Sequence, residues 1–191
     1  MAKICVLLWC LCFAFAGRCG LFGSNIIGGK GNERAGIAGT GEGIAGIARK
    51  AGAAAIVGAA QKEIGVRERL ENSSERIDQY CAYVGLHKVA WCAAFVSFCH
   101  QEAGLAQPKT AWSPALFPSG RLVKGAAPGL VMGIYFPSLG RIAHCGIVER
   151  LQGDFVYVIE GNTNVAGSRE GDGVYRRLRH KRSIASYAAW F

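Results

Sequence analysis

"AWCAAFVSFCHQEAG", residues 90–104, is the stretch that decides the fold class and raises the first question of function. Its apolar residues predict a helix that Gly104 ends. Cys92 and Cys99 lie almost two helical turns apart, so they share one helix face. His100 points away from Cys99, because neighbouring residues of a helix do not face each other. The obvious Cys–His pair is therefore a poor one, and a base for either thiol must come from another segment.

Two further helices are predicted before this segment, and four strands after it. The first helix covers 53–65, and the second covers 73–85 with Ser74 as its N-cap and Gly85 as its stop. Four short segments rich in β-branched and aromatic residues follow a proline-containing loop, and they predict strands at 129–137, 143–150, 154–162 and 173–180. Helices followed by an antiparallel sheet define an α+β fold, in which N-terminal helices pack on a C-terminal sheet.

Composition and charge set the bounds on size and partners. A chain of 191 residues that is 51% hydrophobic is long enough for one well-buried domain with appendages. The net charge of +9 favours anionic partners. The basic run "RRLRHKRS" (176–183) is interpreted as a solvated face, with contact to an anionic polymer as the alternative. Its five cationic side chains are Arg176, Arg177, Arg179, Lys181 and Arg182. No aromatic-interleaved platform accompanies them, so specific nucleic-acid binding is not expected.

The N-terminal residues have the pattern of a targeting segment. A lysine, an apolar run and the small residues "AFA" (14–16) predict a secretory signal peptide over 1–16. The apolar run is too short to cross a bilayer comfortably. We therefore expect export to the periplasm or the extracellular space. An uncleaved membrane anchor, or a lipid anchor on Cys19, is the alternative.

Residues 17–52 are glycine-rich and repetitive, with "GIAG" at 36–39 and again at 43–46. Glycine at this density weakens a helix, so the segment is interpreted as a flexible linker or arm. A small-residue helix that contacts a membrane or a partner is the alternative. The folded domain is accordingly expected to cover 53–191.

The cysteines suggest a reactive thiol rather than a disulfide framework or a metal site. Removal of the signal peptide would leave an odd number of cysteines: Cys19, Cys81, Cys92, Cys99 and Cys145. Cys81, Cys99 and Cys145 are interpreted as small buried apolar residues. No C-x-x-C spacing is present, so neither a metal nor another cofactor is expected.

Cys92 is the better nucleophile, because it lies at the start of its predicted helix, where free N–H groups favour a thiolate. Cys99 lies near the other end and lacks that help. A thiol hydrolase also needs a base and a group that orients the base. His144 lies in a predicted strand, and Glu160 and Asn162 lie in the next one. These four residues are the candidate catalytic set.

The segments that carry these residues closely resemble the cysteine, histidine-dependent amidohydrolase/peptidase (CHAP) domains. The resemblance covers about residues 55–191 and rests on "GVRERLEN" (65–72), "AWCAAFVSFC", "HCGIVE" and "VIEGNTN". It implies a papain-like fold and a peptidoglycan hydrolase of the endolysin or autolysin type. It also implies Cys92 as nucleophile, His144 as base, Glu160 as the orienter of the base and Asn162 as a supporting polar group.

The resemblance does not identify the bond that is cut, since family members cut either the amide between glycan and stem peptide or bonds within the peptides. It implies peptidoglycan as partner, for a chain expected to be monomeric. Some relatives bind calcium through acidic residues around the nucleophile, which "LHKVAWCAA" lacks. Two rival functions remain: an inert cell-wall-binding module and a basic nucleic-acid-binding protein.

One geometric prediction concerns the hairpin expected over 143–162. Directly opposed residues of an antiparallel pair point to the same face. A turn centred on Gln152 sets His144 opposite Glu160, and a turn centred on Gly153 sets it opposite Asn162. We therefore expect an odd-numbered loop that places these three site residues on one face.

Overall fold

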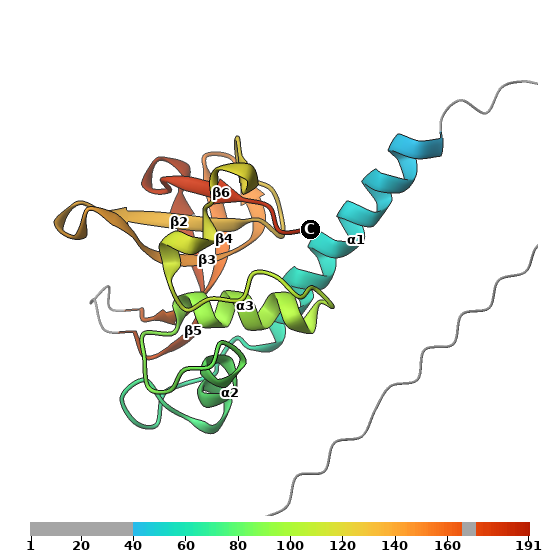
Figure 1. Cartoon of the computed structure of the whole chain (residues 1–191). Coiled ribbons are helices and arrows are strands. Elements are labelled where there is room, and N and C mark those ends of the chain that lie inside the picture. The colour runs from blue at the N-terminus through green and yellow to red at the C-terminus, as the bar shows by residue number, and fades with distance from the viewer. Residues whose placement is uncertain (1–39, 166–170) are drawn as a thin grey trace, which may run out of the picture. The chain divides into compact units, whose positions relative to one another are not determined.

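The structure, a computed structural model, describes residues 40–165 and 171–191, with side chains from residue 43 onward. The predicted signal peptide (1–16) and residues 17–39 of the predicted linker lie outside the described residues. In the described part, three α-helices precede a six-stranded antiparallel sheet (Figure 1). The α+β order predicted from the sequence is thus confirmed.

Helix α1 covers Thr40–Lys62 and begins thirteen residues before the expected domain boundary at Ala53. For 40–52 the segment is therefore a helix, as the alternative had it, and not a flexible linker; nothing shows what this helix contacts outside the chain. The C-terminal half of the helix is fastened to the core by the fully buried Ile56 and Ala60. Adding a residue to an existing helix costs far less than nucleating one, so the glycine-containing first turns continue it although they are exposed.

Part of this helix also has membrane-like composition. Among the described residues, Gly43–Lys62 is the one helical segment long and apolar enough to cross a membrane, and 17% of the window is buried. A single segment of this kind is weak grounds for a membrane span.

Helices α2 (Glu75–Tyr83) and α3 (Cys92–Glu102) lie close to their predicted bounds. Ser74 caps α2 by accepting a hydrogen bond from the Ile77 amide at 3.4 Å. α3 lies between α2 and the sheet (Figure 1), and its residues from Cys92 to His100 are all buried. Burying one side chain such as Phe95 contributes about 1.5–3 kcal/mol. α3 is thus a core helix, and its first residue is held in a fixed position.

The sheet has the strand order β1-β6-β2-β3-β4-β5. Its strands are β1 (Leu122–Val123), β2 (Val131–Phe136), β3 (Arg141–Gln152), β4 (Phe155–Thr163), β5 (Gly173–His180) and β6 (Ser186–Ala188). The four longer strands were predicted from the sequence. β1 and β6 were not, because two or three residues carry no readable alternation.

Apolar clusters cover both faces of the sheet. One cluster contains residues of α3 together with Val131, Ile147 and Ile159. The other cluster contains Leu130, Met132, Val148, Val156, Val158, Ile184 and Ala189. A Cβ at Gly161 would lie 2.7 Å from atoms of Phe95 and Trp91, so glycine is needed for β4 to lie this close to α3.

In the β3–β4 hairpin, His144 and Glu160 point to the same face of the sheet, as expected, but the hairpin geometry that brings this about differs from the predicted one. Gln152 pairs with Phe155, so the turn has two residues, Gly153 and Asp154, and the prediction of an odd-numbered loop is wrong. In a regular ladder this turn would put His144 and Glu160 on opposite faces. The register shifts between Val148 and Arg150, where one extra residue is accommodated. This β-bulge, centred on Glu149, returns His144 and Glu160 to one face.

Candidate active site

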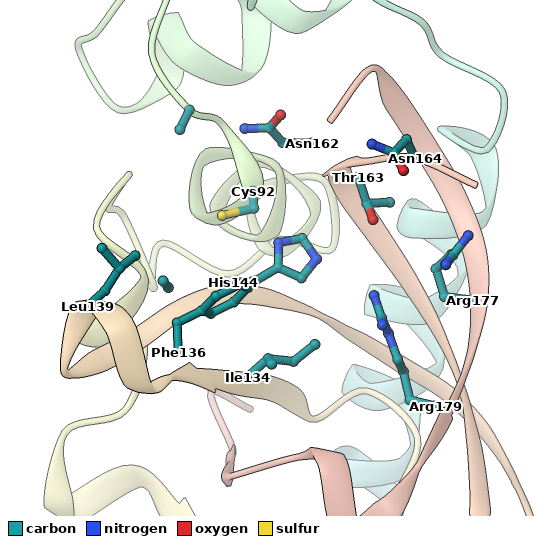
Figure 2. A pocket seen from close by; sticks show the side chains of 12 residues that line it. Cys92, Ile134, Phe136, Leu139, His144, Asn162, Thr163, Asn164, Arg177 and Arg179 are labelled. Carbon is teal, nitrogen blue, oxygen red and sulfur yellow. The ribbon is translucent and has the colours of Figure 1, made fainter. Parts of the chain in front are cut away.

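Cys92 is the first residue of α3 and lines a cleft of about 350 Å³ (Figure 2). The residue is buried, with 5% of its surface exposed. Its Sγ atom lies 3.3 Å from the hydroxyl of Ser113. The first N–H groups of a helix have no partner within the helix, and the positive end of the helix dipole lies there. The helix start therefore stabilises negative charge on this sulfur.

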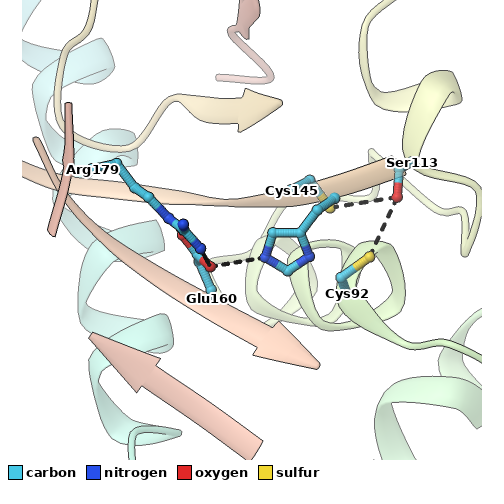
Figure 3. A network of polar contacts seen from close by, with 6 residues as sticks. Cys92, Ser113, Cys145, Glu160 and Arg179 are labelled. Carbon is cyan, nitrogen blue, oxygen red and sulfur yellow. Dashed lines mark hydrogen bonds and ion pairs between the residues drawn. The ribbon is translucent and has the colours of Figure 1, made fainter. Parts of the chain in front are cut away.

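His144 enters the same cleft from β3 (Figure 2), and behind it a buried Glu160 is held by Arg179 (Figure 3). Its Nε2 lies 2.8 Å from Oε2 of Glu160. Because Nε2 is occupied by Glu160, Nδ1 is the ring nitrogen left for the Cys92 sulfur, which lines the same cleft. Glu160 in turn accepts two hydrogen bonds from Arg179, each 2.7 Å long. Imidazole, carboxylate and guanidinium thus form one continuous series, and the Cys92 sulfur lies beside the imidazole in the cleft.

Glu160 reaches His144 across a glycine. A Cβ at Gly146 would lie 2.7 Å from Cγ of Glu160 and 2.8 Å from Val158, in space that the carboxylate stem now occupies. Glu160 is fully buried, so its charge needs close partners in order to be tolerated. His144 and Arg179 supply them.

The pKa values follow from these contacts. A hydrogen bond with Cys145 and one with His144 lower the pKa of Cys92 well below its ordinary value, against the opposing effect of burial. Burial raises the pKa of Cys145 well above its ordinary value, and the neighbouring Cys92 raises it further. Of the two adjacent thiols, Cys92 is therefore the one that ionises.

The imidazole and the carboxylate carry complementary charges. Burial lowers the pKa of His144, but hydrogen bonds with Cys92 and Glu160 outweigh it and raise the pKa to about 10. Burial raises the pKa of Glu160, but hydrogen bonds from Arg179 and His144 reverse this and lower it to about 2. These directions favour a thiolate–imidazolium pair backed by a carboxylate over a neutral thiol and imidazole.

Asn162 lines the cleft on the side of Cys92 (Figure 2). Its backbone has a φ of 52°, in the left-handed region that asparagine tolerates better than most residues. The β4–β5 register shifts between Glu160 and Thr163, which places Asn162 inside an irregular stretch. Cys92, His144 and Asn162 thus line one cleft, and Glu160 lies buried behind His144.

Three further residues of the site were missed by the sequence reasoning. Ser113 begins a short 3-10 helix, and its hydroxyl lies 4.0 Å from Cys145 as well as close to Cys92. Nothing in the sequence pointed to it, because its loop carries no periodic pattern. Cys145 was interpreted only as a buried apolar residue. Arg179 was assigned to the solvated basic run, although its spacing two residues from Arg177 places both on one strand face.

The basic run is therefore not one solvated face. Arg176 forms two hydrogen bonds with Glu149, at 2.6 and 2.7 Å, and Arg179 is occupied by Glu160. Contact of the run with an anionic polymer stays a prediction for Arg177, Lys181 and Arg182.

The other residues of the opening segment lie away from the site. His100 is fully buried, with Nδ1 2.8 Å from the Val96 carbonyl oxygen, and burial lowers its pKa to about 4. Burial raises the pKa of Cys99 well above its ordinary value. Cys81 and Cys99 are buried free thiols, as expected. In the described ranges, no three His, Cys, Asp or Glu residues are grouped to hold a metal ion.

No family model and no curated protein matches the chain. One solved structure, the crystal structure of Ly7917, is similar with 14% sequence identity and a TM-score of 0.42. The match covers 71% of this chain and 60% of that one, so the chain spans about three fifths of the structure's length.

Proposed function

We propose that this protein is a cysteine-dependent peptidoglycan hydrolase of the CHAP type, with a papain-like arrangement of α3 against the sheet. The observation that carries the proposal is the Cys92–His144–Glu160 series in an open cleft. A nucleophile, a base beside it and a carboxylate that orients the base are the parts that acyl transfer from an amide requires. The resemblance in the segments around these residues supports peptidoglycan as the substrate.

The reaction follows from the charges. The Cys92 thiolate attacks the carbonyl carbon of the amide, and the N–H groups at the start of α3 are placed to stabilise the oxyanion. The C–N bond breaks as the His144 imidazolium gives its proton to the leaving amine. A water molecule then loses a proton to His144 and attacks the thioester, which releases the carboxylic acid and restores the Cys92 thiolate and the His144 imidazolium.

Each other residue has a stated part in this scheme. Glu160 holds the ring of His144 and stabilises its charged form, while Arg179 keeps Glu160 ionised and in place. Asn162 supports the cleft wall beside the sulfur. The amide bond of the substrate is either the one that joins glycan to stem peptide or one within the peptides. The signal peptide predicted over 1–16 fits an exported enzyme, which acts where peptidoglycan lies.

The test is incubation of the full chain with purified peptidoglycan, followed by mass spectrometry of the released fragments. Newly freed amines establish amide hydrolysis, and the fragment masses identify the bond. Cys92→Ser should abolish release, because a hydroxyl is not ionised by this setting. Cys99→Ser is the matched control and should retain most activity, with circular dichroism used to verify folding. Equal losses in both variants would contradict the assignment of Cys92.

Binding without cleavage by the folded wild-type chain would favour the inert wall-binding module instead. Binding to DNA or RNA that weakens steeply with salt would favour the nucleic-acid alternative.

A further inference from the structure

The cleft around Cys92 and His144 has two chemically different ends. Figure 2 shows Phe136 and Leu139 on one side of the reacting groups and the two arginines, Arg177 and Arg179, on the other. The remaining lining residues are uncharged or belong to the site: Ala90, Ile134, Ala143, Asn162, Thr163 and Asn164. No carboxylate is among the described lining residues. Among the described lining residues, the charge outside the reacting groups is therefore positive.

The two arginines differ in their partners. Arg179 is neutralised by two hydrogen bonds to the buried Glu160. Arg177 lies two residues away on β5, so it shares the strand face of Arg179. In the part of the chain that the structure describes, ion pairs hold Arg76, Arg176 and Arg179, and no carboxylate pairs with Arg177. A half-buried guanidinium without a counter-charge is a binding group for an anion from outside the chain.

We propose that Arg177 is a specificity-determining residue that binds a carboxylate of the substrate beside the amide to be cut. This inference rests on the proposed function and deepens it: the substrates cleaved best are peptides with a free carboxylate close to the scissile bond. The planar guanidinium can donate two parallel hydrogen bonds to a carboxylate, which an amide cannot accept with equal strength. The apolar end, at Phe136 and Leu139, receives the uncharged side of the peptide.

The experiment compares two matched substrates on the full chain. Soluble peptidoglycan fragments are used as prepared, with free carboxylates, and after carbodiimide-driven amidation of those carboxylates with ammonia. Hydrogen bonds to charged groups contribute about 1.5–3 kcal/mol, which corresponds to roughly tenfold to a hundredfold. The wild type should therefore show a kcat/KM on the amidated fragments lower by about that factor, mainly through a higher KM.

In Arg177→Gln, kcat/KM on the carboxylated fragments should fall by the same factor. This variant should no longer distinguish the two substrates. Arg177→Lys should restore part of the preference, because the charge returns without the fork of donors. Arg150→Gln is the control, since it removes the same charge from an exposed β3 residue that stacks on Tyr157 outside the cleft. It should leave both the activity and the preference unchanged.

A binding measurement separates this inference from the proposed function. Calorimetry with the full-length Cys92→Ala protein compares the affinities of the carboxylated and amidated fragments, with and without Arg177→Gln. A preference that depends on Arg177 supports the inference, even if the wild type cleaves neither substrate and the proposed function fails. Equal affinities in the Cys92→Ala protein, or a preference that survives Arg177→Gln, would overturn it.

Discussion

The β3–β4 hairpin carries two buried glutamates, and an arginine of β5 holds each of them with two hydrogen bonds. At the β-bulge of β3, Arg176 binds Glu149 at 2.6 and 2.7 Å. Near the cleft, Arg179 binds Glu160 at 2.7 Å twice. The two pairs are alike in geometry, and they differ in the third group that contacts the carboxylate.

The third contact decides what each carboxylate does. Glu149 accepts a hydrogen bond of 2.6 Å from the side-chain amide of Gln61, so this pair joins α1 to the sheet at the β-bulge. Glu160 contacts the imidazole of His144 and so raises its pKa. The guanidinium of Arg176 is also more exposed than that of Arg179, at 45% against 25% of the side chain. The Glu149–Arg176 pair therefore has a structural role, and the Glu160–Arg179 pair makes His144 more basic.

The largest contrast is expected from Glu160→Gln against Glu149→Gln. Neutralising Glu160 removes the charge that stabilises the imidazolium, and the comparable change in a serine protease costs about 10⁴-fold in rate. A thiolate–imidazolium pair depends on it less, so we expect kcat/KM to fall by about a hundredfold to ten-thousandfold. Glu149→Gln should leave kcat/KM within about threefold and lower the free energy of unfolding by roughly 1–3 kcal/mol. Equal loss of activity in both variants would remove the distinction between the pairs.

The second contrast is Arg179→Gln against Arg176→Gln. Without Arg179, the pKa of Glu160 rises and its carboxylate is less firmly held, so His144 loses part of its orientation. We expect kcat to fall by about tenfold to a hundredfold while KM changes little, because the effect acts through another residue. Arg176→Gln should lower stability in urea unfolding and leave kcat unchanged. A fall in kcat after Arg176→Gln would show that the pair at the β-bulge also controls the site.

The third prediction concerns the alkaline limit of activity. The His144 pKa of about 10 lies above the ordinary value, so the charged form is the one the folded state favours. The contribution of this protonation to the stability of the folded protein is fully present below about pH 6.5, and it is lost as the pH rises through about 10. kcat/KM should therefore fall about tenfold per pH unit above 10. In Glu160→Gln the alkaline limb should move to lower pH, and in Glu149→Gln it should not move.

A smaller effect is expected at Asn162, which lies on the strand of Glu160 but has no charge to give the imidazole. Asn162→Ala should cost less activity than Glu160→Ala, by roughly tenfold or more. The measurement is kcat/KM of both variants on the same peptidoglycan preparation. The reverse ranking would mean that the amide, and not the carboxylate, orients His144.

The smallest effect on activity is expected at His100. It follows Cys99 directly but is aimed at the Val96 carbonyl, so His100→Gln should leave kcat/KM unchanged. Because the side chain is fully buried, the free energy of unfolding should fall by about 1–3 kcal/mol. Loss of activity without loss of stability would give His100 a role that its position does not explain.

Particular residues show how far prediction from the sequence reaches. Ser74, Gly85 and Gly104 were predicted to bound helices and do so, because caps and left-handed stops are local properties of the chain. The choice of Cys92 over Cys99 as the better thiolate rested on position in one helix, and the pKa directions of the two thiols agree with it. The start of α1 was placed too late, because its exposed turns depend on the anchored half of the same helix.

The sequence by itself determined the elements, their order and which side chains could do chemistry, since these depend on spacing within single helices and strands. Only the tertiary structure decided the partners. Ser113 reaches Cys92 from a loop, and Arg179 crosses from β5 to Glu160. The bulge at Glu149 sets the facing of His144 because one extra residue in a ladder reverses every later side chain. No local pattern encodes that residue, since its carboxylate is held by groups from α1 and β5 that lie far from it in the chain.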